Sequence, residues 1–279
     1  MQSTLTHTDE YSGPSRMTEN GAAMAEIRTT THNAIRIVTI SNERKRNAFE
    51  GLMSQELLSQ FELADADPAI RAVVVTGAGD LAFSSGHDLN DLSTGASSDA
   101  DGMDEGPVLK PMSMKKPVIA AINGHCYAAA LMLAMSCDLR VASENATFGS
   151  PGARLGMLPE GGQIGRLPLL MGRSAALEMM LTGAPLSAKD AFRSGFVSRL
   201  VPVGGALSTA LTLAEAIGGN APAVVSAIKQ GVLLAETSGV AQAEQFERST
   251  ARMLQKESDA AEGVKAFLEK RKPVFTNVA

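Results

Sequence analysis

The segment from residue 117 to 168 constrains the fold more than any other part of the chain. Residues 118–122 form a short apolar run with β-branched members, which predicts a buried strand, and Asn123-Gly124 supplies the turn that ends it. Residues 127–136 then carry no charge on any face, so they predict a helix enclosed by protein on all sides. A second strand is predicted over 138–142. Such a helix requires a substantial core, which a chain of 279 residues can supply.

The first turn of this predicted helix has a chemical consequence. The amides near Ala128, Ala129 and Ala130 have no intrahelical acceptor and lie at the positive end of the helix dipole. Amides in that position can hold a carbonyl oxygen that gains negative charge during a reaction. Every helix has an N-terminus, so this pattern alone is also compatible with a purely structural helix.

Strand and helix patterns separated by glycine turns recur on both sides of the central segment and indicate an α/β fold. Further strands are predicted at 34–40, 71–76 and 196–201, and further helices at 50–66 and 174–182. From about residue 206 only helical patterns remain. We therefore expect a disordered leader at 1–26, a βα core at 27–203 and a helical C-terminal region at 204–279. Periodicity does not distinguish a flat sheet from a barrel or a spiral.

Composition argues against several classes of function. A net charge of −5 does not favour a protein that grips nucleic acid, and no apolar run approaches the roughly 20 residues that span a bilayer. Cys126 and Cys137 lack metal-ligand spacing and are expected in the core, so no metal site is predicted. Cysteine usage and the absence of a secretory signal pattern favour a cytoplasmic location, with no membrane partner.

Motifs for nucleotide phosphates and for serine nucleophiles are missing from the sequence. No GxGxxG follows a predicted strand, and Gly77-Ala78-Gly79-Asp80 is too short a match. There is no Walker A loop and no GxSxG elbow. The chemistry must therefore come from other residues.

Four stretches together resemble the enoyl-CoA hydratase/isomerase (crotonase) family. They are NERKRNAF, AFSSGHDL, KKPVIAAINGHCYAAALMLAMSCDLRVASENATFGSPGARLGMLPEGG and ALEMMLTGAPLSAKDAFRSGFVSRLV, and the likeness runs over residues 27 to 275. It implies a crotonase-like spiral of ββα units with a C-terminal helical trimerisation region. It also implies an acyl-CoA thioester substrate, a homotrimer or dimer of trimers, and no cofactor beyond the coenzyme A of the substrate.

The resemblance assigns two backbone amides to the oxyanion hole that stabilises a thioester enolate. One belongs to His87 in SSGHD and the other to Ala129 in YAAALM, and the side chain of His87 has no role. Alanines at 128–130 replace the glycines usual in the family but still supply N–H groups. Their methyl groups are expected to narrow the thioester slot.

The carboxylates depart from the pattern of the family's hydratases. Hydratases use two glutamates, whose positions here hold Met132 and Gly152, and neither residue can move a proton. Glu160, in Leu-Pro-Glu-Gly-Gly, matches the position of the single base of Δ3,Δ2-enoyl-CoA isomerases. One carboxylate suffices for a 1,3-proton shift, so the site pattern is closest to these isomerases. In the alternative structural interpretation, Glu160 caps the next helix or faces solvent.

The resemblance also suggests where coenzyme A lies. The candidate binding residues run from two basic residues near the phosphates, past the loop before the oxyanion hole, to a C-terminal helix of a neighbouring subunit: Arg44, Lys45, Ala82, His87, Asp88, Leu89, Asn90, Met132, Phe267 and Lys270. A basic triplet such as Arg44-Lys45-Arg46 is also common in a solvated turn.

Two other functions remain open from the sequence. A non-catalytic acyl-CoA binder would keep the oxyanion amides without turnover. A hydratase, hydrolase or dehalogenase of the same family would use a different carboxylate, or would use Glu160 as a nucleophile.

Overall fold

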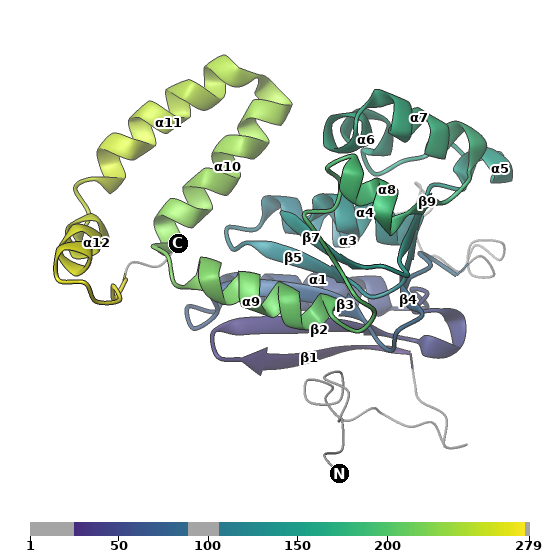
Figure 1. Ribbon diagram of the computed structural model, residues 1–279, viewed down its shortest axis with the longest axis horizontal. Coiled ribbons are helices and arrows are strands. Elements are labelled where there is room, and N and C mark those ends of the chain that lie inside the picture. Colours follow the sequence, from purple (N-terminus) through teal and green to yellow (C-terminus); the bar gives the residue numbers. More distant parts are fainter. Residues whose placement is uncertain (1–24, 89–105, 277–279) are drawn as a thin grey trace, which may run out of the picture.

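The fold is built on two β-sheets, shown in the computed structural model, which describes residues 25–88 and 106–276 (Figure 1). The larger sheet has the strand order β1-β2-β3-β5-β7-β10, and the smaller has the order β4-β6-β8-β9. The strands are β1 Glu26–His32, β2 Ile35–Ser41, β3 Ala72–Gly77, β4 Ala82–Ser84, β5 Val118–Ile122, β6 His125–Tyr127, β7 Leu139–Ser143, β8 Thr147–Gly149, β9 Leu186–Ser187 and β10 Arg199–Val201. Only the β1–β2 and β8–β9 pairs are antiparallel.

The helices follow the strands in a repeating order. They are η1 Glu43–Lys45, α1 Met53–Ala66, α3 Gly106–Ser113, α4 Ala129–Ser136, α5 Gly152–Leu155, α6 Gln163–Met171, α7 Arg173–Thr182, α8 Ala188–Arg193, α9 Ala206–Gly218, α10 Pro222–Ser238, α11 Val240–Leu254 and α12 Ser258–Leu268. The pairs β5–β6 and β7–β8 each place one strand in the larger sheet and the next in the smaller sheet, and a helix follows. This alternation is the expected spiral of ββα units.

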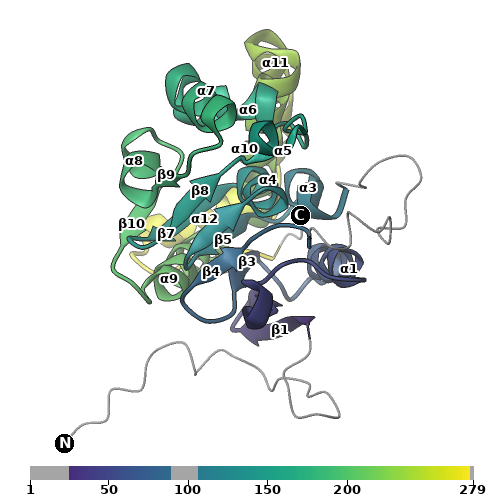
Figure 2. The same ribbon diagram turned by 90° about the vertical axis from the view of Figure 1, so that its right-hand side faces the viewer.

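The larger sheet is buried on both faces, as parallel strands covered by helices usually are. Alternate residues of its strands belong to separate clusters: Val73 and Val75 face one cluster, whereas Ala72 and Val74 face the other. Helices α1, α3 and α4 contribute to the first cluster, and α9 contributes to the second. Figure 2 shows the strands between these helices. The sheet therefore forms the middle layer that fixes the start of α4.

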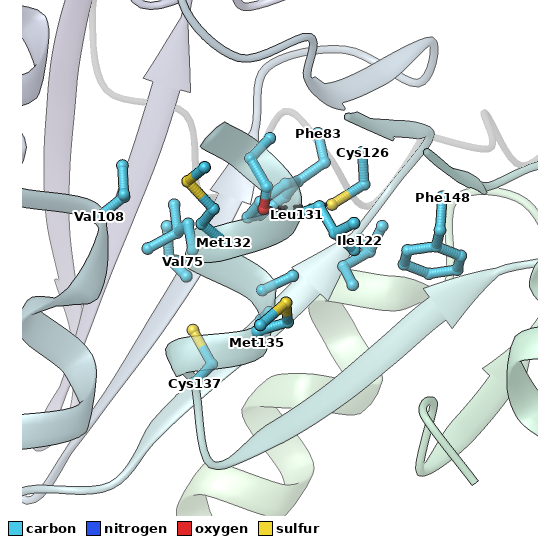
Figure 3. Close-up of a cluster of buried hydrophobic side chains, with 14 of the residues drawn as sticks. Val75, Phe83, Val108, Ile122, Cys126, Leu131, Met132, Met135, Cys137 and Phe148 are labelled. Atoms are coloured by element: carbon cyan, nitrogen blue, oxygen red, sulfur yellow. Dashed lines mark hydrogen bonds between the residues drawn. The ribbon is translucent and has the colours of Figure 1, made fainter. Parts of the chain in front are cut away.

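Helix α4 is buried along its whole length, as its uncharged sequence predicts. Figure 3 shows Leu131, Met132 and Met135 of this helix among side chains from several strands. The predicted core cysteines are both buried, and Cys126 donates its Sγ hydrogen to the carbonyl oxygen of Ala130 at 3.3 Å. Burial raises the pKa of both thiols, that of Cys137 to about 12, so these are inert core residues.

The C-terminal helices divide into one that packs on the sheet and others that extend from it. Helix α9 lies against β3, β5 and β7, whereas α10 and α11 leave the sheet as a hairpin (Figure 1). The predicted core at 27–203 thus omits α9, whose Ala210 and Ala214 are fully buried against the sheet. A helix that packs on a sheet and a helix in a separate C-terminal region have the same apolar periodicity. The sequence therefore did not reveal the contact of α9 with the sheet.

Several short elements were missed from the sequence. Strands β4, β6 and β8 have three residues each, which is too short for an alternating pattern. Strand β1 is mostly polar and lies at the edge of the larger sheet, where it pairs only with β2 among the described strands. The predicted leader lies outside the described residues up to residue 24. Among the described helices, none alone is long and apolar enough to cross a membrane, and α9 with α10 meets that test only as a pair bent by 111°.

A buried lysine joins the extended helices to the core. The Lys229 ammonium on α10 lies 2.8 Å from the Asp138 carboxylate and donates to the carbonyl oxygen of Pro111 at 2.6 Å. The same Asp138 carboxylate accepts the backbone N–H of Val118 at 2.7 Å. This cluster ties α10 to the first residue of β5 and to α3.

We predict that Lys229→Met lowers the free energy of unfolding by about 2–4 kcal/mol, because it leaves several partly buried acceptors without their donor. Lys256→Met, which changes an exposed lysine in the turn after α11, is the matched control and should change stability little. Urea denaturation of both variants measures the difference. Equal stability of Lys229→Met and the parent would show that the cluster contributes no net stability.

Candidate active site

A cavity of about 570 Å³ lies beside the N-terminus of α4. Its wall comes from the loop after β4, from the start of α4 and from the segment between β8 and α6. The lining residues are Ser85, His87, Tyr127, Ala128, Ala129, Met132, Ser150, Pro151, Gly152, Leu155, Met157, Leu158, Pro159, Glu160 and Gln163. The three predicted catalytic residues, His87, Ala129 and Glu160, therefore share one cavity.

The loop that carries His87 is held by strand-like hydrogen bonds to Phe49. The Phe49 N–H donates to the carbonyl oxygen of Gly86 at 2.8 Å, and the Asp88 N–H donates to the carbonyl oxygen of Phe49 at 3.1 Å. In a parallel ladder, the residue between these two bonds directs its own N–H to the opposite side. The His87 N–H therefore points away from Phe49.

Gly86 brings this loop against the start of α4. A Cβ atom on Gly86 would lie 3.0 Å from the backbone nitrogen of Ala129 and 3.0 Å from the Cβ of Ala128. Gly86 also has φ +90°, a conformation that side chains disfavour. Glycine at this position thus permits the close approach of the two segments that carry the predicted oxyanion amides.

Ala128 has an unusual backbone conformation for alanine, with φ 50° and ψ −120°. Its N–H donates to the carbonyl oxygen of Gly149 at 3.0 Å, and its own carbonyl oxygen accepts the N–H of Met132 at 3.1 Å. Residues held at positive φ store strain that the surrounding structure must offset, and they cluster at functional sites. The turn makes Ala129 the first helical residue, where no intrahelical acceptor exists for its N–H.

The three alanine methyls do not all face the cavity. Ala128 and Ala129 line it, but Ala130 is fully buried in the core cluster. The sequence led us to expect that all three methyl groups narrow the thioester slot. Only those of Ala128 and Ala129 can do so, because Ala130 lies in the core.

Neither hydratase position supplies a carboxylate, and position 152 has no room for one. Met132 lines the cavity with its apolar side chain. A Cβ atom on Gly152 would lie 2.7 Å from the carbonyl oxygen of Met157, so any side chain there requires the backbone to move. The sequence showed the missing glutamate but not this steric restriction.

Glu160 is the one carboxylate among the described residues that line the cavity. It is exposed, and its backbone oxygen accepts the N–H of Gln163 at 3.2 Å. The N-cap of α6 is Gly162, with no hydrogen bond from a capping side chain, so the structure contradicts the interpretation of Glu160 as a helix cap. Its other structural interpretation, exposure to solvent, agrees with the structure.

Ser150 and Gln163 are buried polar residues of the cavity wall that were missed from the sequence. Ser150 and Gln163 are 1% and 2% exposed, and among the described residues neither Ser150 Oγ nor Gln163 Oε1 has a hydrogen-bond partner. Their only sequence signal is a polar residue within an otherwise apolar and glycine-rich stretch.

The predicted coenzyme A residues are placed less uniformly. Arg44 is exposed on η1, whereas the Lys45 ammonium contacts Glu50 at 2.9 Å and Asp88 at 2.5 Å. These carboxylates raise the pKa of Lys45, the hydrogen bond to Asp88 being the larger cause. A phosphate near Lys45 would have to compete with them. The buried carbonyl oxygen of Ala82 accepts hydrogen bonds from the side chains of Asn47 and Asn123.

Two other pairs of predicted residues lie apart from the cavity or outside the described residues. Phe267, 83% exposed, and Lys270 are at the end of α12, across the molecule from α5 (Figure 1). Neither lines the cavity of its own chain. Leu89 and Asn90 lie outside the described residues.

Comparisons with known proteins identify the family of this chain. The family model for enoyl-CoA hydratase/isomerase matches residues 30–278. The chain is 33% identical to the mitochondrial enoyl-CoA hydratase of Pongo abelii, over 88% of this chain and 84% of that protein. It is 34% identical to the carnitinyl-CoA dehydratase of Citrobacter koseri, over 88% of this chain and 96% of that protein.

A solved structure gives the same result for the fold. The crystal structure of an enoyl-CoA hydratase from Polaromonas sp. JS666 superposes with a TM-score of 0.84 at 30% identity, covering 90% of this chain and 100% of that one. The chain therefore belongs to the enoyl-CoA hydratase/isomerase family, whose enzymes act on CoA thioesters.

Proposed function

We propose that the protein is an enoyl-CoA isomerase that shifts a double bond from a 3-enoyl-CoA to a 2-enoyl-CoA. The observation that carries the proposal is the single carboxylate, Glu160, among the described residues of a cavity bordered by the amide-bearing residues His87 and Ala129. The rest of that wall is largely apolar and suits an acyl chain.

The proposed reaction needs one base and one site for negative charge. Glu160 removes a proton from C2 of the thioester, and the C2–H electrons move onto the thioester oxygen as an enolate. The amides of His87 and Ala129 stabilise that oxygen. Electrons then return through the dienolate as Glu160 delivers the proton to C4, so the double bond moves with no net change in composition.

Hydration is the second candidate, because the relatives above are named hydratase and dehydratase. Hydration requires a base for water and an acid for the α-carbon. Positions 132 and 152 supply neither, and Gly152 has no space for a larger residue. A hydratase would therefore need a second acid from outside the described cavity wall. A protein that only binds acyl-CoA would show no proton transfer at all.

We predict that Glu160→Gln lowers the rate of 3-enoyl-CoA isomerisation by about 10²-fold or more, the usual scale for loss of a general base. Acyl-CoA affinity should stay nearly unchanged, since glutamine keeps the side-chain size and the amides are untouched. Steady-state assays with 3-enoyl-CoA and 2-enoyl-CoA measure both activities. Vigorous hydration that persists in Glu160→Gln would reject the isomerase assignment.

We predict that Gly86→Ala lowers turnover by about 10²-fold, because the new methyl displaces the Ala129 amide from the enolate oxygen. Gly239→Ala is a matched control: it has φ +91° against +90° for Gly86, but its nearest neighbour is a side-chain oxygen at 3.7 Å and it does not line the cavity. Both variants should lose about 1 kcal/mol of stability from the positive φ. Equal turnover in the two would argue against the proposed oxyanion hole.

We also infer a homotrimer or a dimer of trimers from the extended helices. Helix α10 leaves Ile228 62% and Val232 58% exposed in the single chain, and Phe267 on α12 is 83% exposed. Exposed apolar side chains on neighbouring helices are typical of a protein interface. The C-terminal helix of a neighbour would then carry Phe267 and Lys270 to the coenzyme A of this chain. Cytoplasmic location stays a prediction.

We predict a native mass of three or six chains at micromolar concentration. Val232→Asp should shift this mass toward the monomer, because a charge would be buried at the interface. Val203→Asp, at a loop residue that is 56% exposed, is the matched control and should keep the parent mass. Native mass spectrometry compares the three proteins. A monomeric parent would contradict the inference.

A further inference from the structure

Ser150 and Gln163 are polar side chains that the proposed proton transfer does not use. Both line the cavity, and both are almost fully buried. Within the described part of the chain, Ser150 Oγ and Gln163 Oε1 have neither a hydrogen-bond partner nor access to water. Buried polar atoms are normally paired, because losing water without a replacement partner is unfavourable. A group that enters the cavity can supply the missing partner.

The two residues lie on the segments that flank Glu160. Ser150 follows β8 and precedes α5, and Gln163 is the first residue of α6. The hydrogen bond from the Gln163 N–H to the Glu160 backbone oxygen fixes Gln163 relative to the proposed base. A ligand group that contacts this pair would therefore be positioned relative to the proton-transfer centre.

Both side chains can turn toward a ligand without moving the backbone. The Ser150 hydroxyl rotates about χ1, and the terminal amide of Gln163 rotates in a broad energy well that exchanges its oxygen and nitrogen. Together they offer both donors and acceptors. The neighbouring wall is apolar at Met132, Leu155 and Met157. This combination suits a hydrocarbon chain that carries one group able both to donate and to accept, which describes a hydroxyl.

We propose that Ser150 and Gln163 form a polar subsite that binds a hydroxyl group on the acyl chain, so that the preferred substrates are hydroxylated enoyl-CoA thioesters. The inference rests on the proposed function in so far as the acyl chain occupies this cavity. A water molecule bound to the same pair would give no preference among acyl chains that leave it in place.

The test compares the binding of hexanoyl-CoA with that of the three hydroxyhexanoyl-CoA isomers, which carry a hydroxyl group at C4, C5 or C6. The measurement is calorimetry in the Glu160→Gln background, which removes the one carboxylate of the described cavity wall that could otherwise accept a hydrogen bond from the added hydroxyl. We expect at least one isomer to bind about 10-fold more tightly than hexanoyl-CoA. Ser150→Ala and Gln163→Met should abolish this preference, measured in each variant as the affinity for the hydroxylated compound relative to that for hexanoyl-CoA.

Ser143→Ala is the matched control. Ser143 Oγ is also buried and unpaired among the described residues, but Ser143 does not line the cavity, so the hydroxyl preference should survive this change. If hexanoyl-CoA binds but no isomer binds more tightly, or if the preference survives in both cavity variants, the subsite proposal is wrong. Failure of every acyl-CoA to bind would overturn both this proposal and the proposed function. Loss of isomerase activity alone would not affect the binding result.

Discussion

The close approach of Gly86 to the first residues of α4 is the contact on which the site depends. It is possible because position 86 has no side chain, and because Ala128 accepts a backbone conformation that is unfavourable for alanine. The burial of α4 on every side holds that strained turn in place. The ββα spiral and its sheet therefore support one small region of backbone, where the proposed mechanism places a thioester oxygen between two amides.

The chemistry of the cavity follows from how few acids it contains. Glu160 is its carboxylate within the described residues, and the contact between position 152 and the Met157 carbonyl excludes a second acid from the place where hydratases keep one. This shortage of acids is the reason for proposing that the site moves a proton within a substrate rather than adding water. In the proposed subsite, Ser150 and Gln163 offer hydrogen bonds but no acidic group. They would therefore affect which substrate binds rather than the proton transfer.

Much of the fold could be predicted from the sequence because its main elements have strong local patterns. The strand predicted at 118–122 is β5, and the uncharged stretch after it is α4, which begins at Ala129 rather than Tyr127 because residues 125–127 form a short strand. The pairing of the His87 amide with the Ala129 amide followed from a family likeness. The burial of Ser150 and Gln163, and the crowding at Gly152, depend on contacts between distant segments and have no local signal.

The role of Glu160 as the base can be tested by exchange of deuterium from solvent into C2 of a bound, saturated acyl-CoA. This exchange reports enolate formation without any double-bond shift or hydration. We expect exchange by the parent protein and exchange slower by about 10²-fold in Glu160→Gln. No exchange by the parent, or equal exchange by both proteins, would contradict the role of Glu160 as the base.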